Sequence, residues 1–327
     1  MKPLVILTHP MPSGWVAGLE KEVRLVTGPA NTANVSPDLQ PHFAEAEGLL
    51  TWLIDRVDEA LLAQMPRLKV VSNLAVGVDN IDLEACTRRG IAVGHTPGVL
   101  TEAVADLTMG LLLAVARGIP AAAADARAGR WGLWRPDGWL GREMHGATIG
   151  ICGLGQIGQA VARRAAAFGL RVLYTSRRPK PEAEAAWGAR RVPWTTLLRE
   201  SDFLSLHCPL TAETRGLVDA RALRQMKPTA YLINMARGPV VDTAALTQAL
   251  QQGWIAGAAL DVTDPEPLPP QHPLYRLPNC LITPHIGSAT ETTRRRMADL
   301  AVANLLAGLR GEPLPHCANP AVYGQAP

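Results

Sequence analysis

The chain has few aromatic residues, few cysteines and no concentration of positive charge. Phenylalanine, tyrosine and tryptophan make up 5% of the 327 residues. The 32 lysines and arginines are spread along the sequence and are nearly balanced by 29 acidic residues, which leaves a net charge of +3. Nucleic-acid-binding surfaces usually need clustered basic side chains, often with interleaved aromatic rings. We therefore expect no nucleic acid partner.

The five cysteines are far apart and show no paired spacing (Cys86, Cys152, Cys208, Cys280 and Cys317). This excludes a zinc ribbon and a disulfide framework, predicts no metal site and favours a reducing compartment. The apolar run near the N-terminus is too short for the core of a signal peptide. The longest apolar run, Leu107 to Val115, is interrupted by Gly110 and is too short to cross a bilayer. We expect a soluble, cytoplasmic protein with no membrane partner.

What the sequence does contain is a regular alternation of short apolar runs and helical patterns. This alternation is typical of parallel sheets covered by helices, and the length suggests about two domains. The first set of expected strands is Leu4–His9, Val23–Thr27, Leu49–Ile54, Val70–Leu74 and Ile91–Val93. The second set is Thr148–Cys152, Arg171–Thr175, Phe203–Leu206, Tyr231–Asn234, Gly257–Asp261 and Cys280–Thr283.

Two long helices decide how these strands are divided between domains. The first, Thr101–Arg117, separates the two strand sets, and the second, Ser288–Leu309, follows the last strand. Because the final helix comes too late to cover the second sheet, we assign it to the first domain. The sequence thus predicts a discontinuous domain of residues 1–99 and 285–327, with residues 100–284 inserted in it. A ligand cleft is expected at the hinge.

A glycine fingerprint, Gly153-Leu-Gly-Gln-Ile-Gly158, lies between an expected strand and the helical pattern Gln159–Phe168. In a dinucleotide-binding fold, such glycines permit the tight turn, the approach of the pyrophosphate and close packing of helix on strand. The N-terminus of the helix then offers free N–H groups to the phosphates. A merely structural glycine-rich turn is the alternative. The expected cofactor contacts are Gly153, Leu154, Gly155, Gln156, Ile157 and Gly158.

Cofactor preference should depend on the residues that follow the next strand, Arg171–Thr175. NAD enzymes usually place an acidic residue there to bind the ribose hydroxyls. This chain has Ser176, Arg177 and Arg178 instead. A hydroxyl and two guanidinium groups would hold a 2′-phosphate, so we predict that NADP(H) is preferred and that NAD(H) is possible. The alternative is that both arginines are solvated surface charges.

Arg237 and His285 each follow an expected strand, where side chains emerge at the ligand-binding edge of a parallel sheet. The planar guanidinium of Arg237 could engage both the carboxylate and the carbonyl oxygen of a 2-keto acid. Reduction of a ketone also needs a proton donor, and histidine commonly fills that role. The alternatives are that Arg237 caps the next loop and that His285 is structural.

Further motifs lie around these residues in a fixed order, and through them the chain resembles the D-isomer-specific 2-hydroxyacid dehydrogenase family over essentially its whole length. Within that family it is most similar to the glyoxylate/hydroxypyruvate reductases. The motifs are Asn73-Leu-Ala-Val-Gly-Val-Asp-Asn80, the glycine fingerprint, His207-Cys-Pro-Leu-Thr211, Asn234-Met-Ala-Arg-Gly238, Leu260-Asp-Val-Thr-Asp-Pro-Glu-Pro267, Thr283-Pro-His-Ile-Gly-Ser-Ala-Thr290 and Ala303-Asn-Leu-Leu-Ala-Gly-Leu-Arg-Gly-Glu-Pro313.

The resemblance implies a fold and a reaction. The fold is α/β, with two doubly wound parallel-sheet lobes: a Rossmann dinucleotide-binding domain inserted in a discontinuous, flavodoxin-like substrate domain. The reaction is NADPH-dependent reduction of small 2-keto acids by hydride transfer, from glyoxylate to glycolate and from hydroxypyruvate to D-glycerate. Arg237, Glu266 and His285 would be catalytic. Glu266 would contact the imidazole of His285, and a buried carboxylate there would favour the charged ring and fix its tautomer.

The resemblance also implies contacts for the substrate and the nicotinamide. The backbone N–H groups of Val76 and Gly77 would bind the substrate carboxylate. Ser288 could bond the C3 hydroxyl of hydroxypyruvate, although a helix N-cap would look the same in the sequence. Asp261 would orient the nicotinamide carboxamide. The remaining cofactor positions would be Thr101, Cys208, Pro209, Met235, Ala236, His285 and Gly287, of which Thr101, Pro209 and Met235 could equally be core residues.

Three tryptophans, Trp131, Trp134 and Trp139, precede the fingerprint strand. They could form a hydrophobic plug between the lobes. The resemblance instead implies a homodimer interface in this region, with a tryptophan of the partner subunit closing the substrate pocket. We favour Trp139 for that role, and aromatic enrichment at interfaces is consistent with this choice.

Other functions share the scaffold. Formate dehydrogenases place glutamine where Glu266 stands, which argues against that activity. Phosphoglycerate dehydrogenases use the same scaffold but commonly carry an added regulatory domain. An NAD-dependent dehydrogenase with another substrate preference remains open. So does a dinucleotide-sensing binding protein like the corepressors of this fold, which retain the same catalytic triad. The basic residues after the second strand of the inserted domain argue against the sensor.

Overall fold

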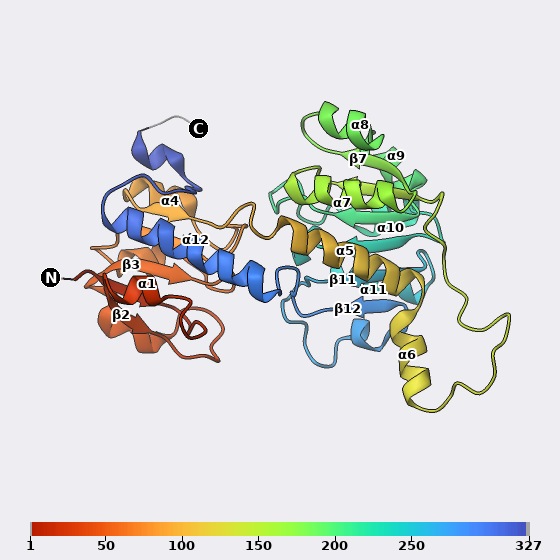
Figure 1. The fold of residues 1–327 in the computed structure, drawn as a ribbon, viewed down its shortest axis with the longest axis horizontal. Coiled ribbons are helices and arrows are strands. Elements are labelled where there is room, and N and C mark those ends of the chain that lie inside the picture. The colour runs from red at the N-terminus through yellow and green to blue at the C-terminus, as the bar shows by residue number, and fades with distance from the viewer. Residues whose placement is uncertain (1, 325–327) are drawn as a thin grey trace. The chain divides into compact units, whose positions relative to one another are not determined.

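A computed structural model describes residues 2–324 and divides the chain into two compact units (Figure 1). One unit combines the residues up to Leu100 with those from Thr290 onward, and the other is Thr101–Ala289. The expected boundaries, after residues 99 and 284, are therefore wrong by one and five residues. The second error has a local cause, because the N–H of His285 donates to the carbonyl of Asp261 at 3.0 Å. This bond ties the start of the expected return segment to the inserted unit.

The first unit contains a five-stranded parallel sheet within the described residues, in the order β2-β1-β3-β4-β5. This is the flavodoxin-like order that the sequence analysis expected. The strands are β1 (Leu4–Leu7), β2 (Arg24–Thr27), β3 (Ala46–Thr51), β4 (Val70–Asn73) and β5 (Ala92–Gly94).

Helices cover both faces of this sheet. They are α1 (Ala17–Glu20), α2 (Gln40–Phe43), α3 (Glu59–Ala63), α4 (Leu83–Arg88) and α12 (Glu291–Leu309), with 3-10 turns η1 (Pro37–Leu39) and η4 (Pro320–Tyr323). Successive residues of β1 point to opposite faces: Val5 packs with residues of α12, and Ile6 packs with residues of α2 to α4. Ser72 fixes the final helix on the sheet by donating to the carbonyl of Ala301 at 2.8 Å. The final helix thus groups with the first unit.

The second unit contains a seven-stranded parallel sheet within residues 101–289, in the order β12-β11-β10-β9-β6-β7-β8. The strands are β6 (Thr148–Cys152), β7 (Arg171–Thr175), β8 (Arg190–Arg191), β9 (Phe203–Leu206), β10 (Tyr231–Asn234), β11 (Gly257–Leu260) and β12 (Cys280–Ile282). β6 pairs with both β7 and β9, so the strand order reverses there, and this is the switch point where Rossmann folds bind dinucleotides.

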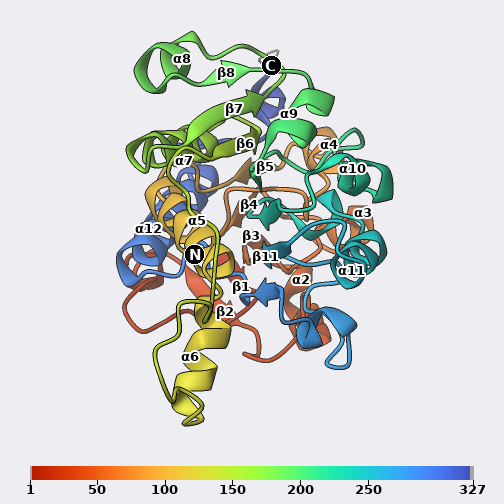
Figure 2. The same cartoon turned by 90° about the vertical axis from the view of Figure 1, so that its right-hand side faces the viewer.

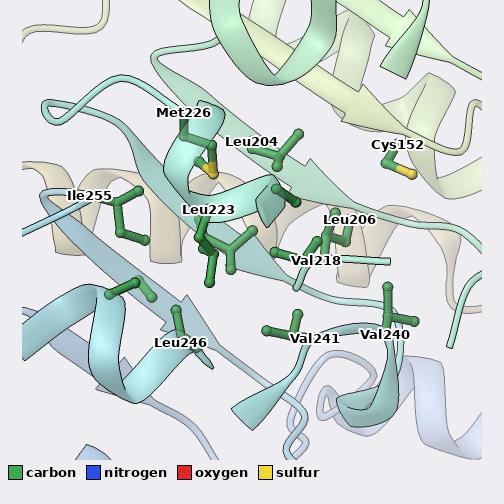
Figure 3. Packing of buried hydrophobic residues seen from close by; sticks show 14 of the residues in the cluster. Cys152, Leu204, Leu206, Val218, Leu223, Met226, Val240, Val241, Leu246 and Ile255 are labelled. Atoms are coloured by element: carbon green, nitrogen blue, oxygen red, sulfur yellow. The ribbon is translucent and has the colours of Figure 1, made fainter. Parts of the chain in front are cut away.

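The helices of this unit are α5 (Thr101–Ala116), α6 (Ile119–Arg127), α7 (Gln156–Ala167), α8 (Pro181–Trp187), α9 (Trp194–Glu200), α10 (Ala220–Gln225) and α11 (Thr243–Gln251), with 3-10 turns η2 (Gly238–Val240) and η3 (Pro273–Arg276). α5 and α7 pack together on one face of the sheet, and α9, α10 and α11 cover the other (Figure 1). Figure 3 shows the apolar core beneath α10 and α11, a cluster that contains Leu204 and Leu206 of β9, Leu223 of α10 and Leu246 of α11.

α6 and the segment that follows it extend away from the sheet of the second unit (Figure 2). We call residues 119–142 the arm. Its base is fixed by Asp202, whose carboxylate accepts hydrogen bonds from Arg142 at 2.9 Å, Lys227 at 3.0 Å and the N–H of Thr148 at 2.9 Å. Among the described helices, none alone is long and apolar enough to span a membrane. α5 and α6 together reach that length and apolarity, but the two helices are bent by 65° relative to each other.

Candidate active site

Arg237, Asp261 and His285 follow three neighbouring parallel strands of the second unit. Arg237 lies three residues beyond β10, Asp261 directly follows β11, and His285 lies three residues beyond β12. The carboxyl ends of parallel strands share one edge of the sheet, so the three residues lie along the edge where α/β folds bind ligands. The structure thus brings these predicted residues to one edge of one unit.

The loop that carries Arg237 is held by the buried side chain of Asn234. Its amide oxygen accepts from the N–H of Ala236 at 3.0 Å, and its amide nitrogen donates to the carbonyl of Arg237 at 2.9 Å. At Gly238 a Cβ atom would lie 1.8 Å from the carbonyl oxygen of Thr263. Only glycine permits this contact, which places the Arg237 loop directly against the loop that carries Glu266.

Glu266 and His285 form a close pair. The Nδ1 atom of His285 lies 2.5 Å from Oε1 of Glu266, while Oε2 of Glu266 accepts from the N–H of Thr263 at 3.2 Å. Because the carboxylate accepts a hydrogen bond from Nδ1 of His285, the other ring nitrogen, Nε2, is available to a ligand. The expected burial is wrong, because the side chains of His285 and Glu266 are 25% and 31% exposed. Glu266 lies in a proline-containing surface loop, so water reaches part of its carboxylate.

The turn that carries His285 is organised by Asp261. The buried carboxylate of Asp261 accepts from the hydroxyl of Thr283 at 2.6 Å and from the N–H groups of Ile286 and Gly287, both at 2.8 Å. These bonds stabilise a left-handed backbone at His285, where φ is +51°. For a residue other than glycine, this conformation costs roughly 1–2 kcal/mol. This organising role was not predicted, although an aspartate at a strand end before Thr283-Pro-His-Ile-Gly is a signal for it in the sequence.

A cavity of about 1000 Å³ lies beside the glycine turn of the second unit. Its lining includes the predicted residues Gly153, Leu154, Gly155, Ser176, Arg177, Arg178, Cys208 and Pro209. The other predicted cofactor residues lie outside this lining: Gln156, Ile157, Gly158, Thr101, Met235, Ala236, Asp261, His285 and Gly287. The last five of these lie in the loops after β10, β11 and β12.

The glycine turn has the geometry that a dinucleotide needs. Gly153 has a φ of +93°, and a Cβ atom there would lie 2.7 Å from the N of Cys208. At Gly158 a Cβ atom would lie 2.1 Å from the carbonyl oxygen of Gly153. Gly155 precedes α7, and the space around its missing side chain is open. The N-terminal N–H groups of α7 are thus free of side-chain caps and suit a pyrophosphate.

The residues after β7 line the cavity together with Lys180, which the sequence analysis did not include. Lys180 continues the basic run Arg177-Arg178-Pro-Lys180, and that run could have revealed it. An acidic residue, Glu213, lines the same cavity. A hydrogen bond from Thr211, and to a smaller extent the charge of Arg177, holds the pKa of Glu213 below its usual range. The cavity is therefore mainly cationic, with one carboxylate.

His207, which the sequence analysis treated as structural, also lines the cavity. Its Nε2 lies 2.8 Å from the hydroxyl of Ser205, whereas its buried Nδ1 has no partner among the described residues. Burial lowers the pKa of His207 to about 3, so the ring stays neutral. A neutral ring with one unsatisfied nitrogen suits a polar ligand better than a closed core.

Val76 and Gly77 lie in the loop after β4, in the first unit. Two side chains hold this loop through the carbonyl groups of these residues and not through their N–H groups. Asn73 donates to the carbonyl of Gly77 at 2.9 Å, and Nδ1 of His95 donates to the carbonyl of Val76 at 2.9 Å. Ser288 belongs to the second unit, and it is not a helix N-cap, because Thr290 caps α12 by accepting from the N–H of Thr293 at 3.1 Å.

The arm carries the three predicted tryptophans. Trp131 and Trp134 are exposed, and Trp139 donates from its indole nitrogen to Asp125 at 3.1 Å. Within residues 2–324, no group of three or more His, Cys, Asp or Glu side chains is placed to hold a metal ion.

Comparison with known proteins identifies the family. Residues 109–287 match the family model described as D-isomer specific 2-hydroxyacid dehydrogenase, NAD binding domain. This chain belongs to the D-isomer specific 2-hydroxyacid dehydrogenase family. It is therefore an NAD(P)-dependent oxidoreductase, and the Rossmann fold expected for its inserted unit is confirmed.

Relatives resemble the chain along its length. A glyoxylate reductase of Thermococcus litoralis is 47% identical, with 100% of both chains covered. A glyoxylate reductase/hydroxypyruvate reductase of Mus musculus is 47% identical, covering 96% of this chain and 98% of the mouse protein. Among solved structures, a protein of Thermus thermophilus is 48% identical with a TM-score of 0.90, covering 96% and 99% of the two chains. An NADPH-dependent glyoxylate/hydroxypyruvate reductase of Sinorhizobium meliloti, solved with NADP and malonate, is 35% identical with a TM-score of 0.85 and 97% coverage of each chain.

Proposed function

We propose that this protein reduces small 2-keto acids with NADPH, converting glyoxylate to glycolate and hydroxypyruvate to D-glycerate. The observation that carries the proposal is the 2.5 Å contact between His285 and Glu266 at the ligand-binding edge of a dinucleotide-binding sheet. A paired imidazole with a free Nε2 is what protonation of a substrate carbonyl requires. The names of the mouse relative and of the Sinorhizobium meliloti reductase contain both substrates, and the name of the Thermococcus litoralis relative contains glyoxylate.

Each catalytic residue has one task in this proposal. A nicotinamide dinucleotide bound beside the glycine turn would supply the hydride that adds to C2 of the keto acid. The guanidinium of Arg237 binds the substrate carboxylate and orients the carbonyl. Nε2 of His285 donates a proton to the carbonyl oxygen, and the carboxylate of Glu266 stabilises the charged ring before the transfer. Asp261 keeps the His285 turn in place and, as the resemblance implies, orients the nicotinamide carboxamide.

Other residues contribute to binding. We propose that the N–H groups of Val76 and Gly77 bind the substrate carboxylate and that Ser288 bonds the C3 hydroxyl of hydroxypyruvate. The hydroxyl of Ser288 makes no hydrogen bond to the rest of the described chain, so it is available for that bond. The first unit would thus act as the substrate domain, and the inserted unit holds the cofactor.

The test of the activity is the loss of NADPH absorbance with glyoxylate, hydroxypyruvate and pyruvate measured in parallel. We expect turnover with the first two acids, and the comparison ranks them. No turnover with any 2-keto acid would refute the reductase and favour a dinucleotide sensor.

We propose NADP(H) as the preferred cofactor because Ser176, Arg177 and Arg178 line the cavity and no acidic residue follows β7 directly. Changing Ser176→Asp together with Arg177→Ala introduces a carboxylate and removes a cation. We expect the ratio of kcat/KM for NADPH over NADH to fall by about 100-fold, since each charge-assisted bond contributes roughly 1.5–3 kcal/mol. An unchanged ratio would contradict the preference.

We also propose a homodimer formed through the arm. Its six large apolar residues, Ile119, Trp131, Leu133, Trp134, Trp139 and Leu140, are between 45% and 81% exposed. Clustered exposed apolar side chains mark interaction surfaces. Trp139 is our candidate for the residue that closes the substrate pocket of the partner subunit.

A further inference from the structure

The basic loop after β7 lines the cavity, but two side chains that hold its backbone in place do not belong to the cavity lining. We call residues 176–180 the cofactor loop, and four of its five residues, Ser176, Arg177, Arg178 and Lys180, line the cavity. Three of these carry positive charge and lie within four residues of one another. Like charges at such short spacing repel, so the backbone needs support if the side chains are to converge on one anion.

Arg191 supports the first half of the cofactor loop. Its Nη2 donates to the carbonyl oxygen of Ser176 at 2.9 Å and to that of Arg177 at 3.2 Å. Arg191 lies on β8, where it pairs with Tyr174 of β7, and it does not line the cavity. Its hydrogen bonds to the loop are therefore to the backbone and not to the side chains that line the cavity.

Tyr174 supports the far end of the loop. Its buried hydroxyl accepts from the N–H of Lys180 at 2.8 Å and donates to Oε1 of Glu184 at 2.6 Å. Burial, together with Glu184, raises the pKa of Tyr174, so the phenol keeps its proton and remains a donor. Within the loop, the hydroxyl of Ser176 donates to the carbonyl of Arg178 at 2.5 Å. Both ends of the loop and its middle are thus held by hydrogen bonds within the protein.

We infer that Arg191 is a positioning residue that sets the preference for NADPH over NADH, by holding the cofactor loop in the shape that binds the 2′-phosphate. This inference rests on the proposed function, since it needs a phosphorylated cofactor in the cavity. A preorganised site binds more tightly because less loop ordering has to occur on binding. NADH lacks the phosphate that the three cations would bind, so its affinity depends far less on the shape of this loop.

The chain provides a matched control in the adjacent residue. Arg190 lies on the same short strand and is exposed like Arg191, but its Nη2 pairs with Glu200 at 3.2 Å and not with the cofactor loop. Arg190→Ala therefore removes the same side chain and the same charge from β8 without releasing the loop.

The experiment measures the Kd of the full-length protein for NADPH and for NADH by fluorescence titration. For Arg191→Ala we expect the Kd for NADPH to rise about tenfold, a tenfold change being about 1.4 kcal/mol, and the Kd for NADH to rise less than about threefold. The KM for NADPH should rise while kcat at saturating NADPH changes less than about twofold. Arg190→Ala should match the wild type, and Arg191→Lys, which keeps a donor, should restore part of the NADPH affinity.

A second variant tests the same loop from its other end. Tyr174→Phe removes the partner of the Lys180 N–H and keeps the aromatic ring in the core. We expect a selective loss of NADPH affinity of about threefold to tenfold with an unchanged far-ultraviolet spectrum, since one hydrogen bond contributes about 1 kcal/mol.

Three results would overturn the inference. If Arg191→Ala binds NADPH as tightly as Arg190→Ala does, Arg191 does not position the loop. If Arg191→Ala loses NADPH and NADH affinity equally, the residue is structural and does not set specificity. A wild-type enzyme that binds NADH more tightly than NADPH would contradict both this inference and the proposed cofactor. A wild type that prefers NADPH would leave that cofactor standing whatever Arg191→Ala does.

Discussion

Single residues in the loops after β10, β11 and β12 carry the proposed chemistry, and His285 is the clearest case. It combines a left-handed backbone with a close contact to Glu266. The backbone cost is offset by the hydrogen bonds that Asp261 accepts from the following turn. The position is therefore fixed by the protein and not by a ligand, as a proton donor requires.

The first prediction concerns this donor. His285→Ala should lower kcat by at least about 100-fold with little change in the Kd for NADPH, because general acid catalysis contributes about 10²–10⁴ in rate. Glu266→Gln keeps a hydrogen-bond acceptor but removes the charge, so a smaller loss of about tenfold is expected. Steady-state kinetics and fluorescence titration measure the two quantities. His145→Ala removes an exposed histidine of the same unit and serves as the control. Near-normal turnover of the His285 variant would remove this residue from the reaction.

The candidate site shows what the sequence can reveal about individual residues. Arg237, Glu266 and His285 could be predicted as site residues because strand ends and a familiar order of motifs mark them. The exposure of Glu266 and the left-handed backbone of His285 were not, since both depend on how a loop folds back on its neighbours. The same limit applies to His207, which reaches the cavity only through the tertiary fold, whereas the basic run before Lys180 was a usable signal for that residue.

At the level of secondary structure, Asp202 connects elements that are far apart in the sequence. It precedes β9 and binds the end of the arm, the start of β6 and Lys227 before β10. Burial alone would raise the pKa of Asp202, but the bonds from Thr148 and Lys227 outweigh this effect and hold it below its usual range. The charged form thus stabilises the fold.

The second prediction follows from this lowered pKa. Asp202→Asn should reduce the free energy of unfolding by about 2 kcal/mol at pH 7.5, because charged hydrogen bonds at a side chain only 9% exposed are weakened. The stabilising contribution is present above the ordinary carboxyl pKa and is lost as the pH falls through the lower folded value. The difference between the variant and the wild type, followed by urea unfolding, should therefore shrink between about pH 5 and pH 3.

Asp137→Asn is the matched control, since Asp137 pairs with Arg135 at side-chain exposures of 68% and 67%. Such a pair should contribute less than about 1 kcal/mol. Equal losses in the two variants, or a loss at Asp202 that does not depend on pH, would contradict the prediction.

Apolar periodicity predicted most strands of the second unit, and four of them, β6, β7, β9 and β10, have the expected bounds. Two errors are informative. β8 was missed because its two residues are exposed arginines with no apolar pattern, and its pairing with β7 is purely tertiary. β3 was placed three residues late because Leu53 and Ile54 extend the apolar run, although both are exposed in the loop beyond the strand.

At the level of the whole molecule, sequence and structure agree on a discontinuous unit interrupted by an inserted one. The length of the chain and the late position of α12 were enough to predict this. The boundary after Ala289 was not predictable from composition, because the tie between Asp261 and residues 285–287 is a set of backbone and carboxylate bonds.

The third prediction concerns assembly through the arm. Leu133→Glu combined with Leu140→Glu places charges at side chains that are 81% and 78% exposed in the single chain. The fold of one chain should tolerate them, whereas an interface built on these residues should not. Sedimentation velocity should show a dimer for the wild type and a monomer for the double variant. Tyr275→Glu, at a side chain 48% exposed outside the arm, should leave the dimer intact. Identical masses for all three proteins would exclude the arm as the interface.

The contact at Gly238 has a consequence for engineering. A side chain there would collide with the carbonyl oxygen of Thr263. The segment that carries Arg237 and the segment that carries Glu266 are therefore in direct backbone contact. Neither can be remodelled without displacing the other. Libraries that aim to accept bulkier acids should therefore leave residues 234–238 and 261–266 intact and diversify other parts of the chain.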